Sequence, residues 1–171
     1  MIEIREEKPE DIPAIRTVNE RAFEQPAEAN VVDKLREVCP GILSLVAVQG
    51  GKVVGHILFS PAVIEGDGVS IKGMGLAPVA VLPEFQNSGI GSELSREGLR
   101  ILREQGFPFV IVLGHPDYYP RLGFERASHY GISSQWEGIP DEAFMILILD
   151  RKAMGGVSGV ARYRDEFDEA M

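Results

Sequence analysis

The sequence is poor in the features that mark secreted, metal-built or membrane proteins. Its 171 residues contain a single cysteine, Cys39, which excludes an internal disulfide and favours a reducing compartment. No apolar run approaches the ~20 residues needed to cross a bilayer. Residues 1–13 lack the basic and apolar regions of a signal peptide. These absences predict a cytoplasmic protein with no membrane contact.

Positive charge is also scarce. The chain has 17 Lys and Arg against 26 Asp and Glu, a net charge of -9, which argues against nucleic acid as a partner. No His, Asp or Glu cluster has metal-ligand spacing, so no metal is expected. The composition and length are those of one globular domain over residues 1–171, ending in a loosely held tail from about residue 155.

The order of hydrophobic patterns gives a coarse outline of the fold. A short strand and two amphipathic helices precede a meander of three antiparallel strands, and a helix and a buried strand follow the third of these. Because Phe109 to Leu113 are continuously apolar, this last strand is expected to pair in parallel with the strand that ends at Val81. The expected elements are strands at 2–4, 42–48, 52–60, 69–82, 109–113 and 144–149, and helices at 12–18, 31–38, 90–102 and 117–122.

The stretch VLPEFQNSGIGSEL, residues 81–94, places two glycines between the long strand and a helix. It fails as a dinucleotide fingerprint because Leu94 occupies the third glycine position, and it lacks the lysine of a Walker loop. A helix N-terminus with unpaired N–H groups and no Cβ in the way can still bind a phosphate. A plain turn with two tolerant glycines is the alternative that the spacing leaves open.

Two motifs in this order resemble the GNAT superfamily of acyl-CoA N-acyltransferases. The first is Gln86-x-x-Gly89-x-Gly91 after the strand, and the second is YYPRLGF, residues 118–124, in which a tyrosine precedes Gly-Phe. The sequence VLGHPDYYPRLGFERA is also similar to a branch of predicted N-acetyltransferases. The resemblance implies a mixed α/β (α+β) GNAT fold. Its central sheet would be mostly antiparallel, with a splayed parallel strand pair and helices on both faces.

The resemblance also implies a cofactor and the residues that bind it. Acetyl-CoA would act as co-substrate, with its pantetheine arm along the backbone of the motif strand and its pyrophosphate in the glycine turn. Tyr118 would line the cofactor site, and Arg96, Arg100 or Arg121 would lie near the phosphates or decorate the surface. The implied binding residues are Val79, Ala80, Val81, Gln86, Asn87, Ser88, Gly89, Ile90, Gly91, Ser92 and Tyr118.

The implied reaction is direct attack of a small-molecule or peptide amine on the thioester, with Tyr119 as general acid. The general base stays open between His56, His115, Glu84 and water. His56 shares a strand face with apolar residues, which favours a hydrogen-bonded core histidine. A transferase for a longer acyl group and a non-catalytic acyl-CoA-binding sensor are the alternatives, and a homodimer is compatible with the sequence.

Overall fold

A computed structural model describes every residue from Met1 to Met171. It contains three α-helices, nine strands and several short 3-10 helices. The strands are β1 (Ile2–Glu6), β2 (Leu43–Gln49), β3 (Lys52–Gly66), β4 (Val69–Val81), β5 (Phe109–Leu113), β6 (Glu125–Arg126), β7 (Ile132–Ser134), β8 (Phe144–Ile148) and β9 (Gly159–Arg162). The α-helices are α1 (Ile12–Phe23), α2 (Ala27–Val38) and α3 (Ile90–Glu104). None of them is long and apolar enough to cross a membrane.

The hydrogen-bonded strand order is β1-β2-β3-β4-β5-β8-β6, with β9 against β3 and β7 against β9. The β4–β5 and β7–β9 pairs are parallel, whereas β1–β2, β2–β3, β3–β9, β5–β8 and β6–β8 are antiparallel. The predicted mixed, mostly antiparallel sheet with one central parallel pair is therefore confirmed. The chain forms two compact units, and β3 and β4 contribute residues to both.

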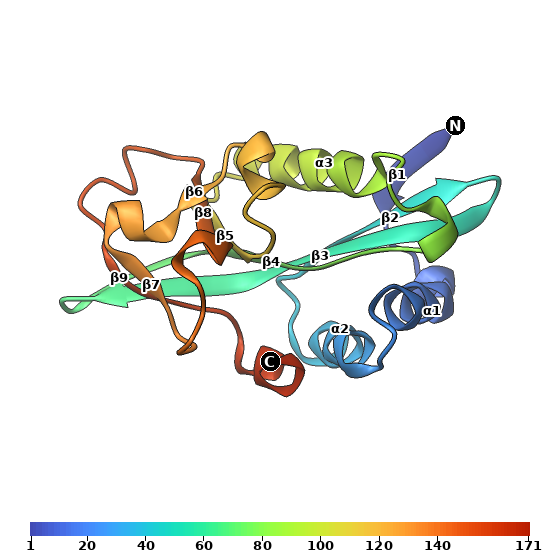
Figure 1. The fold of residues 1–171 in the computed structure, drawn as a ribbon, viewed down its shortest axis with the longest axis horizontal. Coiled ribbons are helices and arrows are strands. Elements are labelled where there is room, and N and C mark those ends of the chain that lie inside the picture. Colours follow the sequence, from blue (N-terminus) through green and yellow to red (C-terminus); the bar gives the residue numbers. More distant parts are fainter. The chain divides into compact units, whose positions relative to one another are not determined.

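Unit 1 consists of Met1–Ser60, Ala77–Leu99 and Asp165–Met171. Here α1 and α2 cover one face of the strands, and α3 covers the other (Figure 1). The helices α1 and α2 bury the apolar stripes that the sequence predicts, including Ile15, Val18 and Leu35. Glycine lets α3 approach β3 closely, because a Cβ at Gly55 would lie 3.0 Å from Ile90 Cγ2. This close packing fixes the N-terminal end of α3.

Unit 2 consists of Pro61–Leu76 and Arg100–Arg164. Its centre is the parallel ladder between β4 and β5, which pairs Met74 with Val110 and ends where Leu76 pairs with Val112. The β4 strand itself continues to Val81. The strand β5 is buried over most of its length, as its continuous apolar sequence predicts.

The C-terminal segment differs from its prediction. Residues from about 155 were expected to form a loosely held tail, but Gly159–Arg162 form β9, paired with both β3 and β7. Tyr163 and Phe167 are buried. The glycines and charged residues of this segment do not predict β9 or the burial of Tyr163 and Phe167, because the residues that pack against these elements are distant in the sequence.

Candidate functional site

The glycine turn after β4, residues 82–89, lies at the surface and is stabilised by two side-chain hydrogen bonds to its own backbone and to the end of β4. Gln86 Nε2 donates to the carbonyl oxygen of Val81 at 3.0 Å, which ties the turn to the end of β4. Ser88 Oγ donates to the carbonyl oxygen of Phe85 at 2.5 Å. The residues from Gln86 to Gly89 are exposed. Of the residues predicted to bind the pyrophosphate, Gln86 to Gly89 thus form a solvent-facing turn, and Ile90 to Ser92 begin α3, where Ile90 is buried.

The backbone of this turn has the conformation that an anion site requires. Asn87 and Gly89 have positive φ angles of 63° and 89°. A Cβ added at Gly89 would meet no atom within 4 Å, so the space beside its backbone is open. The first backbone bond into α3 runs from Glu93 N to Gly89 O at 3.0 Å, and the amides before it have no acceptor within the helix. Amides without an acceptor inside the helix, open space beside Gly89 and the positive end of the helix dipole fit a pyrophosphate.

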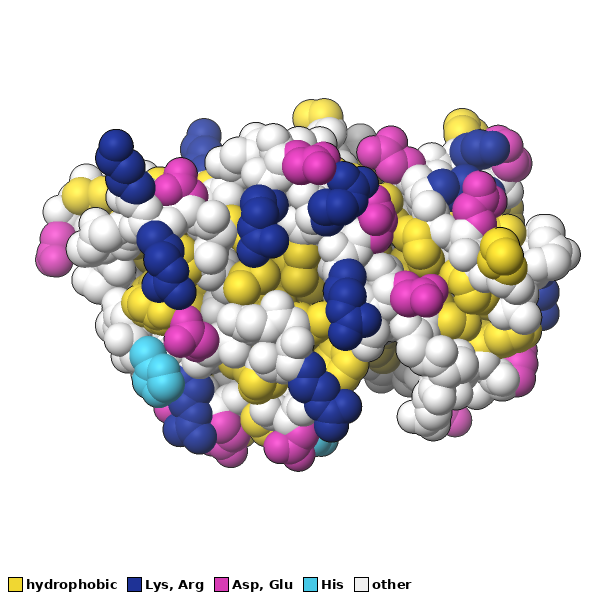
Figure 2. Space-filling model, turned by 90° about the horizontal axis from the view of Figure 1, so that it is seen from above, with side chains coloured by type: hydrophobic (Ala, Val, Ile, Leu, Met, Phe, Trp, Pro, Cys, Tyr) yellow, Lys and Arg dark blue, Asp and Glu magenta, His cyan; other side chains and the backbone are white.

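Basic side chains lie on the outer surface of α3. Arg96 and Arg103 are exposed, and Arg100 pairs with Glu104 at 2.8 Å. The face seen from the α3 side carries several Lys and Arg side chains among acidic and hydrophobic ones (Figure 2). Of these arginines, Arg96 is the one in the first half of α3, nearest along the helix to the turn.

Glu84, one of the candidate bases, is held by an ion pair. Its two carboxylate oxygens accept hydrogen bonds of 2.8 and 2.7 Å from the guanidinium of Arg21. This pairing lowers the pKa of Glu84 below its ordinary value. A carboxylate stabilised in its charged form is a weak proton acceptor, so the structure favours the interpretation of Glu84 as a surface residue.

The two tyrosines of the second motif lie together in unit 2. Tyr119 begins the 3-10 helix Tyr119–Leu122, and its ring packs edge-on against Tyr118 at 4.9 Å and Phe124 at 5.6 Å. The ring also lies directly on Gly114, where a Cβ would collide with it. Burial raises the pKa of Tyr119 to about 12, and the neighbouring Tyr118 adds to the shift. The phenol of Tyr119 therefore stays protonated at neutral pH and can serve as a proton donor.

The predicted site residues fall into two groups. Those at the end of β4 and in the glycine turn lie in unit 1, and the tyrosines lie in unit 2. At the end of β4, Ala80 is buried, whereas Val79 and Val81 are partly exposed. His115 is an exposed side chain in unit 2, 71% accessible, with its Nδ1 accepting a hydrogen bond from the backbone of Asp117 at 3.3 Å.

His56, another candidate base, is fully buried and hydrogen-bonded on both ring nitrogens. Asn19 Nδ2 donates to the Ile15 carbonyl at 3.0 Å and lies 3.1 Å from His56 Nδ1, which must accept. The Nε2 atom then carries the proton and donates to Ser44 Oγ at 2.8 Å. Burial lowers the pKa of His56 to about 3. Its only lone pair is occupied, so His56 is the core histidine that the sequence favours.

The hydrogen-bond chain continues from Ser44 to an ion pair. The Ser44 hydroxyl donates to Glu7, whose carboxylate accepts two bonds of 2.7 and 2.9 Å from Arg36. Burial alone would raise the pKa of Glu7, but the bonds from Arg36 and Ser44 outweigh it and lower that pKa. The direction of donation is opposite to that of a catalytic triad, because histidine donates to serine and does not accept its proton.

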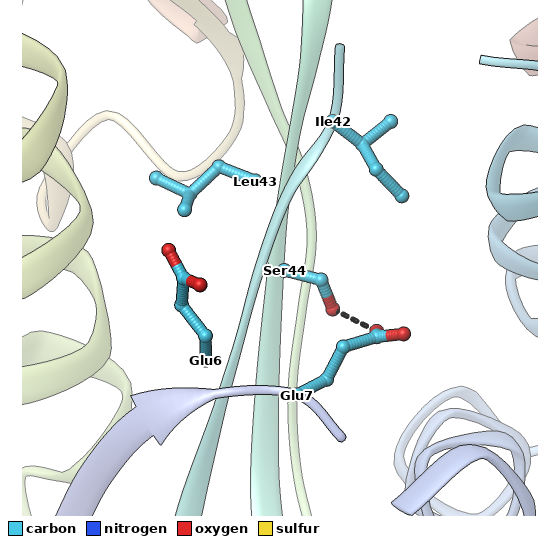
Figure 3. Close-up of a pocket in the computed structure, with 5 residues that line it drawn as sticks. All are labelled: Glu6, Glu7, Ile42, Leu43 and Ser44. Carbon is cyan, nitrogen blue, oxygen red and sulfur yellow. Dashed lines mark hydrogen bonds between the residues drawn. The ribbon is translucent and has the colours of Figure 1, made fainter. Parts of the chain in front are cut away.

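A small hollow of about 160 Å³ borders this chain in unit 1. Ser44 and Glu7 point toward each other on one side of β2, and Glu6 and Leu43 lie on the other side (Figure 3). The Ser44 hydroxyl and the Glu7 carboxylate, which line the hollow, are already hydrogen-bonded to each other. No His, Cys, Asp or Glu cluster in the structure has the geometry of a metal site.

The buried histidine predicts a specific pH dependence of stability. The pKa of His56 is about 3 in the folded chain and 6.5, the ordinary value for histidine, in the unfolded chain. Between these pH values the unfolded chain binds a proton on His56 that the folded chain does not bind. The free energy of unfolding should therefore fall as the pH drops below 6.5, by up to about 1.4 kcal/mol per pH unit for one proton. Urea unfolding at pH 7, 6 and 5 measures this slope. Protonation of Glu7 also lowers the free energy of unfolding as the pH falls, but only around and below pH 4.5, the ordinary pKa of a glutamate.

The control for this measurement is His56→Gln, which retains a polar side chain but does not titrate. Its stability should be nearly constant between pH 6 and 5, whatever its absolute value. Equal slopes in the wild type and the variant would contradict the assignment of the pH dependence to His56.

Comparisons with known proteins converge on one family. The family model described as "Acetyltransferase (GNAT) domain" matches residues 3–127. The uncharacterized N-acetyltransferase YhbS of Escherichia coli K12 is 38% identical over 166 residues, which cover 96% of this chain and 98% of YhbS. The N-acetyltransferase YjhQ of the same strain is 47% identical over 117 residues, 67% of this chain and 65% of YjhQ.

Two solved structures are similar over nearly the whole chain. The crystal structure of Escherichia coli YhbS in complex with CoA has a TM-score of 0.89 and 38% identity, and the match covers 98% of this chain and 92% of that one. The GNAT acetyltransferase of Brucella melitensis, solved with acetyl-CoA, has a TM-score of 0.79 and 36% identity, with 98% and 99% coverage.

Proposed function

The chain belongs to the GNAT family of N-acetyltransferases, and from that premise we propose that it transfers the acetyl group of acetyl-CoA to a primary amine of a small molecule or peptide. The observation that carries the proposal is the open turn at the start of α3, with Gly89 at a φ of 89° and no atom within 4 Å of its missing Cβ. The presence of CoA and acetyl-CoA in structures of the relatives supports the choice of cofactor.

The cofactor would be held by backbone groups along one segment of the chain. Val79, Ala80 and Val81 would pair with the pantetheine arm, and the segment from Gln86 to Ser92 would bind the pyrophosphate. Backbone amides after Gln86 would make these bonds, because the Gln86 N–H donates to the Pro83 carbonyl at 3.4 Å. The bond from Gln86 Nε2 to Val81 O supports this role, because it fixes the turn relative to the end of β4. Acetyl-CoA supplies the acetyl group as a thioester, which an amine can attack directly, with no acyl-enzyme intermediate.

The reaction proceeds by direct attack. The amine nitrogen forms a bond to the acetyl carbon, the carbon–sulfur bond breaks, and the electron pair of that bond leaves with the sulfur. A backbone N–H near Val81 polarises the carbonyl, and Tyr119 donates its phenolic proton to the departing sulfur. The raised pKa of Tyr119, about 12, supports this role because the phenol stays protonated at neutral pH.

The proton released by the amine goes to water, and water returns a proton to the Tyr119 phenolate after the thiol has left. His56 offers no free lone pair, and Glu84 is paired with Arg21. An amine of modest pKa reaches the site partly unprotonated and needs no dedicated base. The single-domain organisation, the cytoplasmic location and a homodimer stay predictions from the sequence.

Two measurements test the proposal. Calorimetry with acetyl-CoA should show binding, and a screen for acetyl-CoA consumption over amines, polyamines, aminoglycosides and peptide N-termini should identify an acceptor. Binding without consumption over the whole screen would favour an acyl-CoA sensor. Faster turnover with a longer acyl-CoA would instead favour a transferase of that group. Absence of acetyl-CoA binding would contradict the proposal itself.

A further inference from the structure

Tyr163 bridges the two parallel strands of unit 2 at the end of their ladder, between the last paired residue of β4 and the next-to-last paired residue of β5. Its hydroxyl lies 3.0 Å from the carbonyl oxygen of Leu76 on β4 and 3.2 Å from that of Ile111 on β5. The ladder between these strands ends where Leu76 pairs with Val112. One phenolic hydrogen is thus shared between two carbonyls at the place where the strands stop pairing.

The ring of Tyr163 is held on several sides. It lies over Gly75, where a Cβ would come within 2.5 Å of the ring, so only glycine fits there. It stacks on Trp136 at 5.6 Å with an interplanar angle of 27°. Its backbone N–H donates to Gln135 Oε1 at 2.5 Å. With 5% of its surface exposed, Tyr163 is a fixed part of the core and has no room to change rotamer.

Tyr163 is also a neighbour of Tyr119. Burial raises the pKa of Tyr163 above its ordinary value, and the nearby Tyr119 phenol raises it further, against a backbone hydrogen bond at Leu113 that lowers it. The hydroxyl therefore stays a donor at every physiological pH.

We propose that Tyr163 is a positioning residue for the acyl end of the cofactor, because it locks the last rung of the β4–β5 ladder from which β4 continues to Val79–Val81. This inference rests on the proposed function, in which that continuation of β4 pairs with the pantetheine arm. Without the hydroxyl, two buried carbonyls at the rung lose a donor, and the strand ends relax toward other partners. The nucleotide end of the cofactor should depend on this rung much less, because the turn is also held by the bond from Ser88 Oγ to the Phe85 carbonyl and by the close packing of α3 on Gly55.

The test compares two ligands on one variant. Tyr163→Phe retains the ring and removes the hydroxyl. Calorimetry is carried out with acetyl-CoA and with 3′-phospho-ADP, the part of coenzyme A that lacks the pantetheine arm. Acetyl-CoA should bind about tenfold more weakly to the variant, the effect of one lost hydrogen bond to positioned groups, while the Kd of 3′-phospho-ADP should change less than twofold.

Two further variants make the result decisive. Tyr130→Phe removes the hydroxyl of a partly exposed tyrosine in the same unit, which binds Glu125, and should leave both Kd values unchanged. Tyr163→Leu, checked for folding by circular dichroism, should weaken acetyl-CoA binding more than Tyr163→Phe does. An unchanged Kd for acetyl-CoA in Tyr163→Phe, or an equal loss for both ligands, overturns the inference. If the wild type fails to bind acetyl-CoA, the proposed function is overturned together with it.

Discussion

Tyr119→Phe should lower kcat at least a hundredfold on an accepted amine while leaving the Kd of acetyl-CoA within about threefold. The substitution removes only the phenolic oxygen. The ring contacts with Tyr118 and Phe124, and the packing on Gly114, are retained. The thiolate would then have to leave without a proton from the protein. This raises the free energy of the transition state but leaves that of the bound acetyl-CoA complex unchanged. Steady-state kinetics for kcat and calorimetry for Kd measure the two quantities separately.

The matched control is Tyr118→Phe, since Tyr118 lies 4.9 Å from Tyr119 and is the other phenol of the motif. It should change kcat less than about threefold, as expected of a group that does not donate to the sulfur. A large loss in Tyr118→Phe together with an intact Tyr119→Phe would transfer the acid role to Tyr118. With a pKa of about 12 for Tyr119, kcat of the wild type should show no loss from phenolate formation up to pH 10.

The central part of the fold could be predicted from local sequence patterns. The continuous apolar run of β5 indicates a strand buried on both faces, and its parallel pairing with β4 is confirmed. The glycine turn and the start of α3 at Ile90 were likewise expected, because polar turn residues and helical periodicity meet there. These features depend on residues close together in the sequence, which is why a single sequence contains them.

The C-terminal part could not be predicted in this way. Tyr163 bonds to the carbonyl of Leu76, 87 positions earlier, and β9 has only four residues. A hint existed in Gly75, a glycine inside a buried strand, which is typical of a close approach by another group. Which side chain approaches it depends on the tertiary structure. The chain from Asn19 through His56 and Ser44 to Glu7 was missed for the same reason.

Gly89→Val should weaken acetyl-CoA binding at least tenfold. The branched side chain would fill the open space beside the backbone at the start of α3, where the pyrophosphate is proposed to lie. It would also have to adopt a φ of 89°, which is strained for a β-branched residue and costs about 1–3 kcal/mol of stability. Calorimetry with acetyl-CoA measures the first effect, and urea unfolding measures the second.

The chain offers a matched control for the strain in Gly106→Val. Gly106 follows the C-terminal end of α3 with a φ of 84°, and a Cβ there also meets no atom within 4 Å. Both substitutions should therefore lower stability by similar amounts. Only the one at the N-terminal end should weaken acetyl-CoA binding, because amides without an intrahelical acceptor and the positive end of the dipole occur at that end alone. If both variants lose affinity equally, the loss comes from a strained backbone. The phosphate cradle would then have to be sought elsewhere in the chain.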